Sequence, residues 1–165
     1  MRHPLAVIAS SLAHPAFQGK AVSHTHPVIS DKLEKTYPEL CEYALSLKNI
    51  EEKLTATWCF DYKIALQRKN KNLHLITYEN FVDKPTTEIN KLSDFLQIDF
   101  PESTYQLVKK PSATVVQAKK DSSIEQLSKW KQKLAPIQIE RMLKVLENFA
   151  IDFYTDDIYP DLTKI

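Results

Sequence analysis

The chain has 165 residues, of which 43% are hydrophobic and 26% are charged, and its 22 basic and 21 acidic residues leave a formal net charge of +1. This composition is typical of one globular domain with its own core, and it lacks the basic excess of a nucleic-acid-binding protein. No run of about 20 apolar residues offers a membrane span, and the N-terminus shows no secretory signal, so we expect a cytoplasmic protein.

The glycine, cysteine and histidine patterns exclude further kinds of site. Gly19 is the single glycine, whereas loops that cradle phosphate with their backbone need several glycines. The chain therefore has neither a Walker-type loop nor a GxGxxG loop. Cys41 and Cys59 lack the spacing of a metal or redox pair, and His24 and His26 lack further ligands at sensible spacing. We therefore expect no metal site.

The first half of the chain predicts helices separated by one long loop. Pro4 suits the first position of a helix, because its missing N–H would be unpaired there in any case. Pro38 breaks a helical stretch into two pieces, and residues 15–30 have the composition of a surface loop. The predicted helices cover residues 5–13, 31–37, 39–48 and 50–68.

The second half predicts one strand and further helices. Leu73 to Thr77 is a short apolar run bounded by polar residues, as expected of a strand. A lone strand is not stable without partners, so the pattern indicates part of an α/β domain whose other strands precede Met1. The remaining helices are expected after an Asp83 cap, over 101–110, after a capping box of Ser122 and Glu125, and from Pro136 to Ala150.

Several blocks of the sequence match the motifs of a known enzyme family, in the family's order and over nearly the whole chain. Arg2 to Ser11 fits the pattern R-x-P-x-x-V-x-x-S, and Leu75 to Phe81 fits a strand followed by Y-E-D-L, with two substitutions. Pro85 to Ile98 resembles a helix that ends in F-L-G followed by leucine or isoleucine, with Gln97 in place of the glycine. Ser128 to Gln138 resembles a late segment in which tryptophan is followed by arginine or lysine, then by x-x-L, by serine or threonine, and by x-x-Q, with Ala135 at the serine or threonine position. The chain thus resembles the sulfotransferases that use 3′-phosphoadenylyl sulfate (PAPS).

The resemblance implies a fold and an activity. The fold would be an α/β sulfotransferase fold similar to that of P-loop NTPases, incomplete and mostly helical here, with residues 1–165 forming a single partial domain. The enzyme would transfer a sulfonate group from PAPS, as co-substrate, to an acceptor hydroxyl or amine without a metal. A carbohydrate, a lipid and a small metabolite are all compatible acceptors.

The resemblance also assigns donor-binding residues. In the family, the arginine and the serine of the first block bind the 3′-phosphate of the donor, which gives this role to Arg2 and Ser10. Tyr78 would contact the adenine or line the site. Lys109 and Lys110 would belong to a basic loop that closes over the 3′-phosphate.

Each of these assignments has a purely structural alternative. Arg2 lies one residue from the start and could be a frayed, solvated arginine. Ser10 could bond back to its own helix, and Tyr78 could be a core aromatic. Lys119 and Lys120 compete for the role of the basic loop, or all these lysines are solvated charges.

No catalytic residue is expected within the chain. Glu79 is expected to cap the next turn or to pair with a cation, and His14 has no visible partner to orient it as a base. The family's phosphosulfate loop and its general base would both precede Met1. We therefore expect a truncated form that is inactive alone. The alternatives are a non-catalytic helical binding or scaffold module, and one piece of a two-chain enzyme completed by an upstream N-terminal fragment.

Overall fold

The structure, a computed structural model, describes residues 1–14, 29–67, 72–107 and 123–164. Within these ranges no strand is assigned, and none of the helices is long and apolar enough to cross a membrane. The elements are α1 (Pro4–Ala13), α2 (Asp31–Thr36), α3 (Pro38–Ser46), α4 (Ile50–Gln67), α5 (Tyr78–Asp83), α6 (Pro85–Leu96), α7 (Glu102–Leu107), α8 (Ser123–Ser128), α9 (Trp130–Lys133), α10 (Pro136–Asn148) and the 3-10 helix η2 (Leu162–Lys164).

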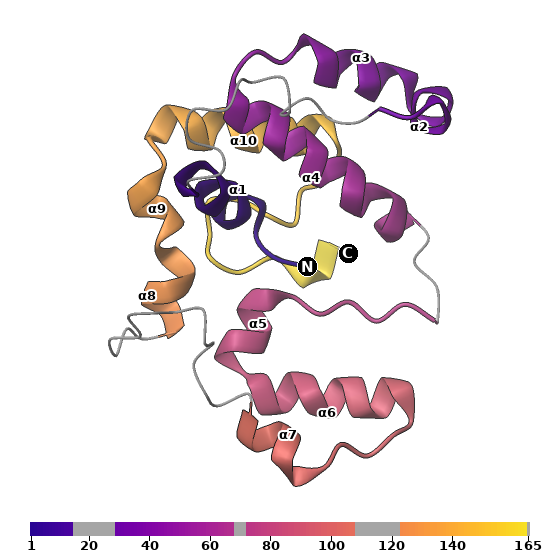
Figure 1. Ribbon diagram of the computed structural model, residues 1–165, viewed down its shortest axis with the longest axis vertical. Helices are drawn as coiled ribbons and strands as arrows, with labels where there is room; N and C mark the ends of the chain where they lie inside the picture. The colour runs from indigo at the N-terminus through magenta and orange to yellow at the C-terminus, as the bar shows by residue number, and fades with distance from the viewer. Residues whose placement is uncertain (15–28, 68–71, 108–122, 165) are drawn as a thin grey trace.

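The helices form a larger and a smaller group (Figure 1). In the larger group α4 packs mainly against α10 and α1, and α9 packs against α1. The smaller group consists of α5, α6 and α7, and α8 contacts it through α5. The first residues of the chain lie between the two groups (Figure 1).

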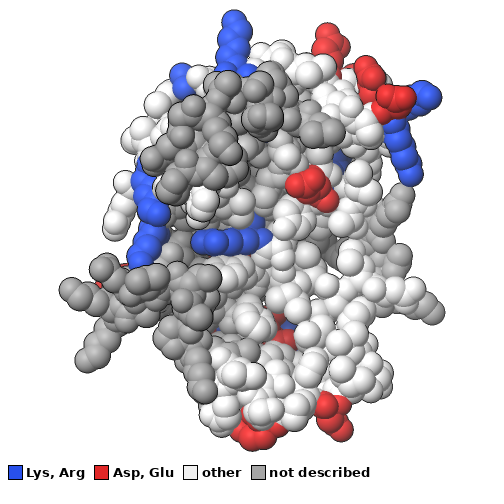
Figure 2. Space-filling view, in the orientation of Figure 1, with Lys and Arg blue, Asp and Glu red and all other residues white. Residues whose placement is uncertain are grey.

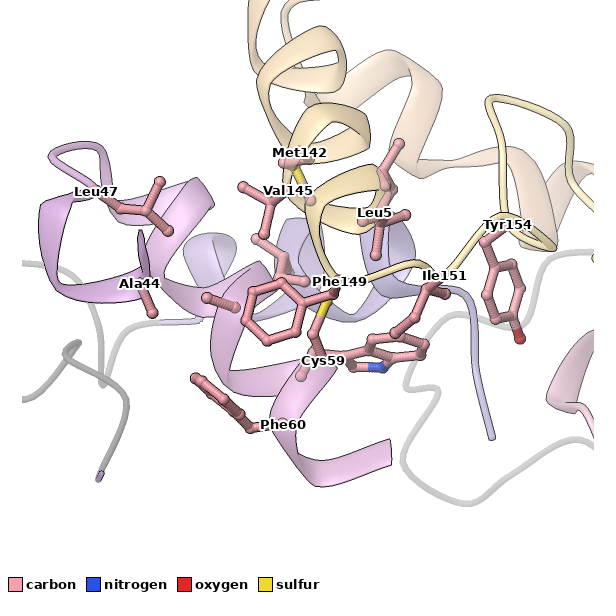
Figure 3. Close-up of a cluster of buried hydrophobic side chains, with 14 of the residues drawn as sticks. Leu5, Ala44, Leu47, Cys59, Phe60, Met142, Val145, Phe149, Ile151 and Tyr154 are labelled. Atoms are coloured by element: carbon pink, nitrogen blue, oxygen red, sulfur yellow. The ribbon is translucent and has the colours of Figure 1, made fainter. Parts of the chain in front are cut away.

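The core lies where α10 and the segment after it meet α4 and α1 (Figure 3). Met142, Val145 and Leu146 share one face of α10 because they recur at helical spacing, and all three are buried. Phe149 follows that face, is fully buried, and meets the ring of Phe60 edge-on with centroids 4.8 Å apart. An aromatic pair of this kind stabilises the fold by roughly 1 kcal/mol beyond the burial of its area.

Among the helices of the described residues, four begin with proline, as expected from its fixed φ and missing N–H. Pro38 therefore begins α3 as well as ending the stretch before it. The predicted Asp83 cap is wrong, because Asp83 is the last residue of α5 and the N-cap of α6 is Lys84, with no side-chain bond. The four prolines at first helical positions are Pro4, Pro38, Pro85 and Pro136.

The strand predicted at Leu73–Thr77 is not assigned in the described part of the chain, where this segment is extended. It forms a single rung of parallel pairing: the Met1 nitrogen donates to the Ile76 carbonyl at 2.6 Å, and the Tyr78 N–H donates to the Met1 carbonyl at 2.7 Å. No longer ladder forms with these residues because the chain turns into α1 at His3. The mostly helical character is thus confirmed, and the α/β class is not shown by the described residues.

The continuous helix expected after Ser122 is also wrong. Ser122 lies outside the described residues, and the helical stretch after it divides into α8 and α9 at a turn on Lys129. Leu127 and Trp130, on the two sides of this turn, are each at most 5% exposed.

Gln97 occupies the position after α6 where the resembling motif has glycine. Its backbone is left-handed, with φ of 55° and ψ of 42°, and its N–H donates to the Ser93 carbonyl at the end of the helix. Glycine is favoured there because a Cβ crowds the backbone in this conformation. The left-handed backbone that favours glycine at this position is thus retained in this chain, where Gln97 adopts it.

Replacing Gln97→Gly is expected to raise the free energy of unfolding by about 0.5–1 kcal/mol, because relief of left-handed strain outweighs the added chain entropy. Urea denaturation measures the change. Lys144→Gly, in the exposed middle of α10, is the control and is expected to lower stability by about 1 kcal/mol. Destabilisation by both glycines would contradict the left-handed assignment of Gln97.

Candidate functional site

Arg2 and Ser10, which the sequence predicted to share a phosphate, line the same small hollow between α1 and the α8–α9 segment. Ala6 and Ser10 lie four residues apart along one side of α1, and Arg2 precedes that helix. Ala6 and Ala9 leave room between the two polar side chains. The hollow measures about 90 Å³ and is lined by Arg2, Ala6, Ala9, Ser10, Gln126, Leu127, Lys129, Trp130 and Lys133.

The charge around this hollow is entirely positive among its described lining residues. Arg2, Lys129 and Lys133 supply three cations, and no aspartate or glutamate is among the lining residues. Figure 2 shows basic side chains along the side of the molecule where α9 lies. Cations gathered around a concave, partly apolar surface raise the local concentration of anions. The hollow is therefore suited to an anionic group.

Arg2 is held in place, so the expectation that it frays is wrong. Its guanidinium carbon lies 4.6 Å from the centroid of the Tyr78 ring, within the range of a cation–π contact. Its Nε is buried and has no hydrogen-bond partner among the described residues. Because buried polar groups in folded proteins are nearly always paired, an unpaired guanidinium nitrogen beside a cationic hollow fits an anionic ligand.

Glu79 fixes the backbone next to Arg2. Its carboxylate is 2% exposed and accepts a hydrogen bond from the His3 backbone N–H at 2.8 Å. The Tyr154 hydroxyl donates to the other carboxylate oxygen at 3.3 Å. Burial, and then the neighbouring Glu79 carboxylate, raise the pKa of Tyr154, which keeps the phenol protonated and able to donate. Glu79 was expected to cap a turn or pair with a cation. Burial chiefly lowers the pKa of the Met1 amino group, and the negative charge of Glu79 raises it, so Glu79 does interact with a cation beside its two hydrogen-bond partners.

The His3 ring lies between two aromatic rings and connects α1 to α9. It stacks on Trp130 at 4.9 Å between centroids, and Tyr154 meets it edge-on at 4.7 Å. The ring is 1% exposed. Since Trp130 also lines the hollow, this stack sets the distance between the two sides of the hollow.

The hydrogen bonds of His3 define its tautomer. Nδ1 lies 3.2 Å from the Leu5 N–H and accepts from it, which caps α1. Nε2 lies 3.0 Å from the Asp157 carbonyl and 3.2 Å from the Thr155 carbonyl, so Nε2 carries the proton. Burial is the main reason that the pKa of His3 is lowered to about 4. The hydrogen bonds to the Asp157 and Thr155 carbonyls raise this pKa, and the positive charges of Lys131 and Arg2 lower it further. His3 is therefore neutral at pH 7.

Of the other predicted site residues, the structure describes Ser10 and Tyr78. Ser10 is exposed, and its hydroxyl has no hydrogen-bond partner among the described residues. Ser11, its neighbour, is the serine that bonds back to its own helix, at 3.1 Å from the Val7 carbonyl. Tyr78 is 41% exposed, with Arg2 over one face of its ring, so it is not a core residue.

Several residues that the sequence singled out lie outside the described ranges. They are Lys109, Lys110, Lys119, Lys120, His24 and His26. Among the residues that are described, no cluster of three or more histidines, cysteines or carboxylates could hold a metal.

Sequence reasoning missed the residues that α8 and α9 contribute to the hollow. Lys129 forms the turn before α9 and Lys133 ends α9, with Trp130 between them in a block already quoted for its resemblance. Lysines around a buried tryptophan were the available signal. That signal does not tell which lysines face α1, since the break between α8 and α9 changes their direction.

A larger hollow, of about 210 Å³, lies between the end of α4 and the C-terminal segment. Its two lysines already donate to backbone carbonyls, Lys63 to Phe149 at 2.8 Å and Lys164 to Asp152 at 3.2 Å. Lys63 thus satisfies a carbonyl just past the end of α10. These contacts give the larger hollow a structural role, and the smaller cationic hollow remains the candidate site.

The lowered pKa of buried His3 predicts how the stability of the protein depends on pH. The unfolded histidine has a pKa near 6.5 and the folded one a pKa of about 4, so between these values the unfolded chain binds more protons. Stability should therefore fall as the pH is lowered from about 6.5 to about 4, by roughly 3 kcal/mol from this residue alone. Urea denaturation across this pH range measures the slope.

His3→Asn is the comparison that isolates this contribution, because asparagine keeps an acceptor for the Leu5 N–H but does not titrate. The variant should lose the part of the pH slope that His3 supplies, whatever its stability at neutral pH. Equal slopes for the two proteins would rule out a neutral, buried His3.

The match to known proteins covers both sides of the hollow. A family model described as a sulfotransferase domain matches residues 2–150, from Arg2 to just beyond α10. Neither a curated protein nor a solved structure matches the chain. The family match extends over most of the 165 residues, and the chain belongs to the sulfotransferase domain family.

Proposed function

We propose that the chain takes part in sulfonate transfer from PAPS and that its cationic hollow binds the 3′-phosphate of this donor. The observation that carries the proposal is that Arg2 and Ser10, eight residues apart, line one hollow with Lys129 and Lys133. The resembling motif R-x-P-x-x-V-x-x-S gives its arginine and serine this role. The convergence of sequence motif and positive charge supports a phosphate ligand.

The size of the hollow supports one phosphate group rather than a whole nucleotide. Its volume is about 90 Å³. Pockets that enclose entire small molecules measure about 300–1,000 Å³. The adenosine would therefore extend out of the hollow, and Tyr78, 41% exposed beside Arg2, offers it an aromatic surface.

Four of the lining residues can interact with a phosphate. The Arg2 guanidinium can place two N–H donors on two phosphate oxygens, which gives charge-assisted bonds. The Ser10 hydroxyl can donate to a third oxygen. Lys129 and Lys133 add positive charge without a fixed geometry, as lysines commonly do toward phosphates.

PAPS would supply the sulfonate group, and the residues of this chain would hold the donor in place. Anchoring the 3′-phosphate far from the reacting sulfur fixes the donor for attack by an acceptor. The residues that stabilise the leaving 5′-phosphate would belong to a glycine-containing loop, and Gly19 is the one glycine in this sequence. We infer that residues 1–165 contribute the 3′-phosphate and adenosine contacts and not the leaving-group loop.

The parallel rung at Met1 favours the proposal that residues 73–77 form a strand of a sheet in the complete enzyme. The Met1 contacts with Ile76 and Tyr78 have the parallel pattern, which in α/β enzymes occurs in sheets covered by helices on both faces. The helices of this chain would then cover one part of a sheet whose further strands belong to another segment or another chain.

Calorimetry with adenosine 3′,5′-bisphosphate tests the phosphate site. Arg2→Ala is expected to weaken binding about 10–100-fold, the usual loss for a charge-assisted bond, and Ser10→Ala about 3–10-fold. Affinity should also fall as salt is added. Lys144→Ala, an exposed α10 cation that does not line the hollow, should leave the affinity within about twofold.

Two results would contradict this site. Equal losses for Arg2→Ala and Lys144→Ala would mean that the nucleotide is attracted by general charge alone. A chain that folds but binds no nucleotide would instead favour a non-catalytic binding or scaffold module.

A transfer assay tests the division of roles. Residues 1–165 alone should transfer no sulfonate from PAPS to hydroxyl or amine acceptors, because the donors for the leaving phosphate are missing. Radiolabelled PAPS with a mixture of such acceptors measures transfer. Transfer above the background rate by the pure chain, abolished by Arg2→Ala, would overturn this division while preserving the phosphate site.

A further inference from the structure

We propose that Tyr78 and Glu79 are positioning residues that hold Arg2 in the orientation needed to bind a 3′-phosphate. The inference rests on the proposed function of the hollow and adds two residues that do not themselves line it. These residues lie at the start of α5, more than 70 positions from Arg2 in the sequence. They would act through Arg2 and would not touch the phosphate.

Three consecutive residues at the start of the chain are each held by this short segment. The Met1 carbonyl accepts from the Tyr78 N–H at 2.7 Å. The Arg2 guanidinium lies over the Tyr78 ring at 4.6 Å. The His3 N–H donates to Glu79 at 2.8 Å. Arg2 is thus fixed through its own side chain and through the backbone on both sides.

The Glu79 bond is the strongest of these constraints on physical grounds. A buried carboxylate that accepts from a backbone N–H forms a charge-assisted bond, which is roughly twice as strong as a neutral one. Tyr154 holds the second carboxylate oxygen at 3.3 Å, so Glu79 has little freedom to turn away. Losing the carboxylate would leave the His3 N–H buried without its partner.

The spacing between Arg2 and Ser10 depends on this bond. His3 is the N-cap of α1 and Ser10 belongs to the same helix, so the helix itself fixes their separation. Arg2 lies before the helix and has no helical hydrogen bond to fix it. Glu79 and Tyr78 therefore determine whether the guanidinium meets a phosphate that Ser10 also contacts.

A double-mutant cycle tests the proposal in the full chain. Wild type, Arg2→Ala, Glu79→Gln and the double variant are titrated calorimetrically with adenosine 3′,5′-bisphosphate and with adenosine 5′-monophosphate. Glu79→Gln should weaken bisphosphate binding about tenfold, an ordinary coupling between residues in contact. It should leave monophosphate binding unchanged, because that nucleotide has no 3′-phosphate. In the Arg2→Ala background it should cause no further loss.

Glu88→Gln is the matched control, because Glu88 is also a buried glutamate, 5% exposed, but it pairs with Lys91 on α6. It should leave both affinities unchanged. Tyr78→Leu is the second test variant, since it removes the aromatic face under Arg2 and keeps the Glu79 carboxylate. It should lower affinity for the bisphosphate more than for the monophosphate, because loss of an adenosine contact weakens both nucleotides whereas loss of Arg2 positioning weakens only the bisphosphate. This variant keeps the proposal testable if Glu79→Gln does not fold.

The outcomes separate this inference from the function on which it rests. If Glu79→Gln or Tyr78→Leu lowers both affinities equally, or lowers bisphosphate affinity equally with and without Arg2, the positioning role is wrong and the phosphate site stands. If the wild-type chain binds the bisphosphate no better than the monophosphate, the phosphate site itself is wrong.

Discussion

The buried carboxylate of Glu79 is the constraint on which the candidate site depends. It accepts hydrogen bonds from the His3 backbone and from Tyr154, and so ties the start of the chain, the start of α5 and the C-terminal segment to one point. Removing a buried carboxylate from water is unfavourable unless donors replace the lost hydration. The two donors come from opposite ends of the sequence. The fold must therefore bring those ends together for Glu79 to be buried.

The cationic hollow is a consequence of the same arrangement. The His3 ring, next to the Glu79 bond, stacks on Trp130 and so brings α9 against α1. Arg2 then faces Lys129 and Lys133 across a hollow with no carboxylate among its described lining residues. Like charges gathered in one place repel each other. A phosphate ligand would relieve this repulsion, and an unpaired Arg2 Nε is consistent with that.

Sequence reasoning predicted most helices because prolines mark their first positions and apolar residues recur at helical spacing. It predicted a strand at Leu73–Thr77 that is not assigned among the described residues, because a strand needs pairing partners that the local pattern does not supply. It missed the break between α8 and α9 at Lys129, which no proline or glycine marks. A motif pointed to Arg2 and Ser10, which line the hollow. It did not point to Lys129 or Lys133, or to the partners of Glu79, because these contacts join segments about 75 to 130 positions apart that local pattern does not relate.

The most direct test of the phosphate site is the nuclear magnetic resonance signal of the Arg2 side-chain Nε–H, assigned by its loss in Arg2→Lys. This N–H is buried and has no hydrogen-bond partner among the described residues. Adenosine 3′,5′-bisphosphate should shift the signal strongly, and adenosine 3′-monophosphate should shift it similarly, because a phosphate bound at the guanidinium changes the electrostatic surroundings of this buried N–H. Adenosine 5′-monophosphate should leave it in place. An unmoved signal under saturating bisphosphate, or an equal shift with the 5′-monophosphate, would contradict the assignment of the hollow to the 3′-phosphate.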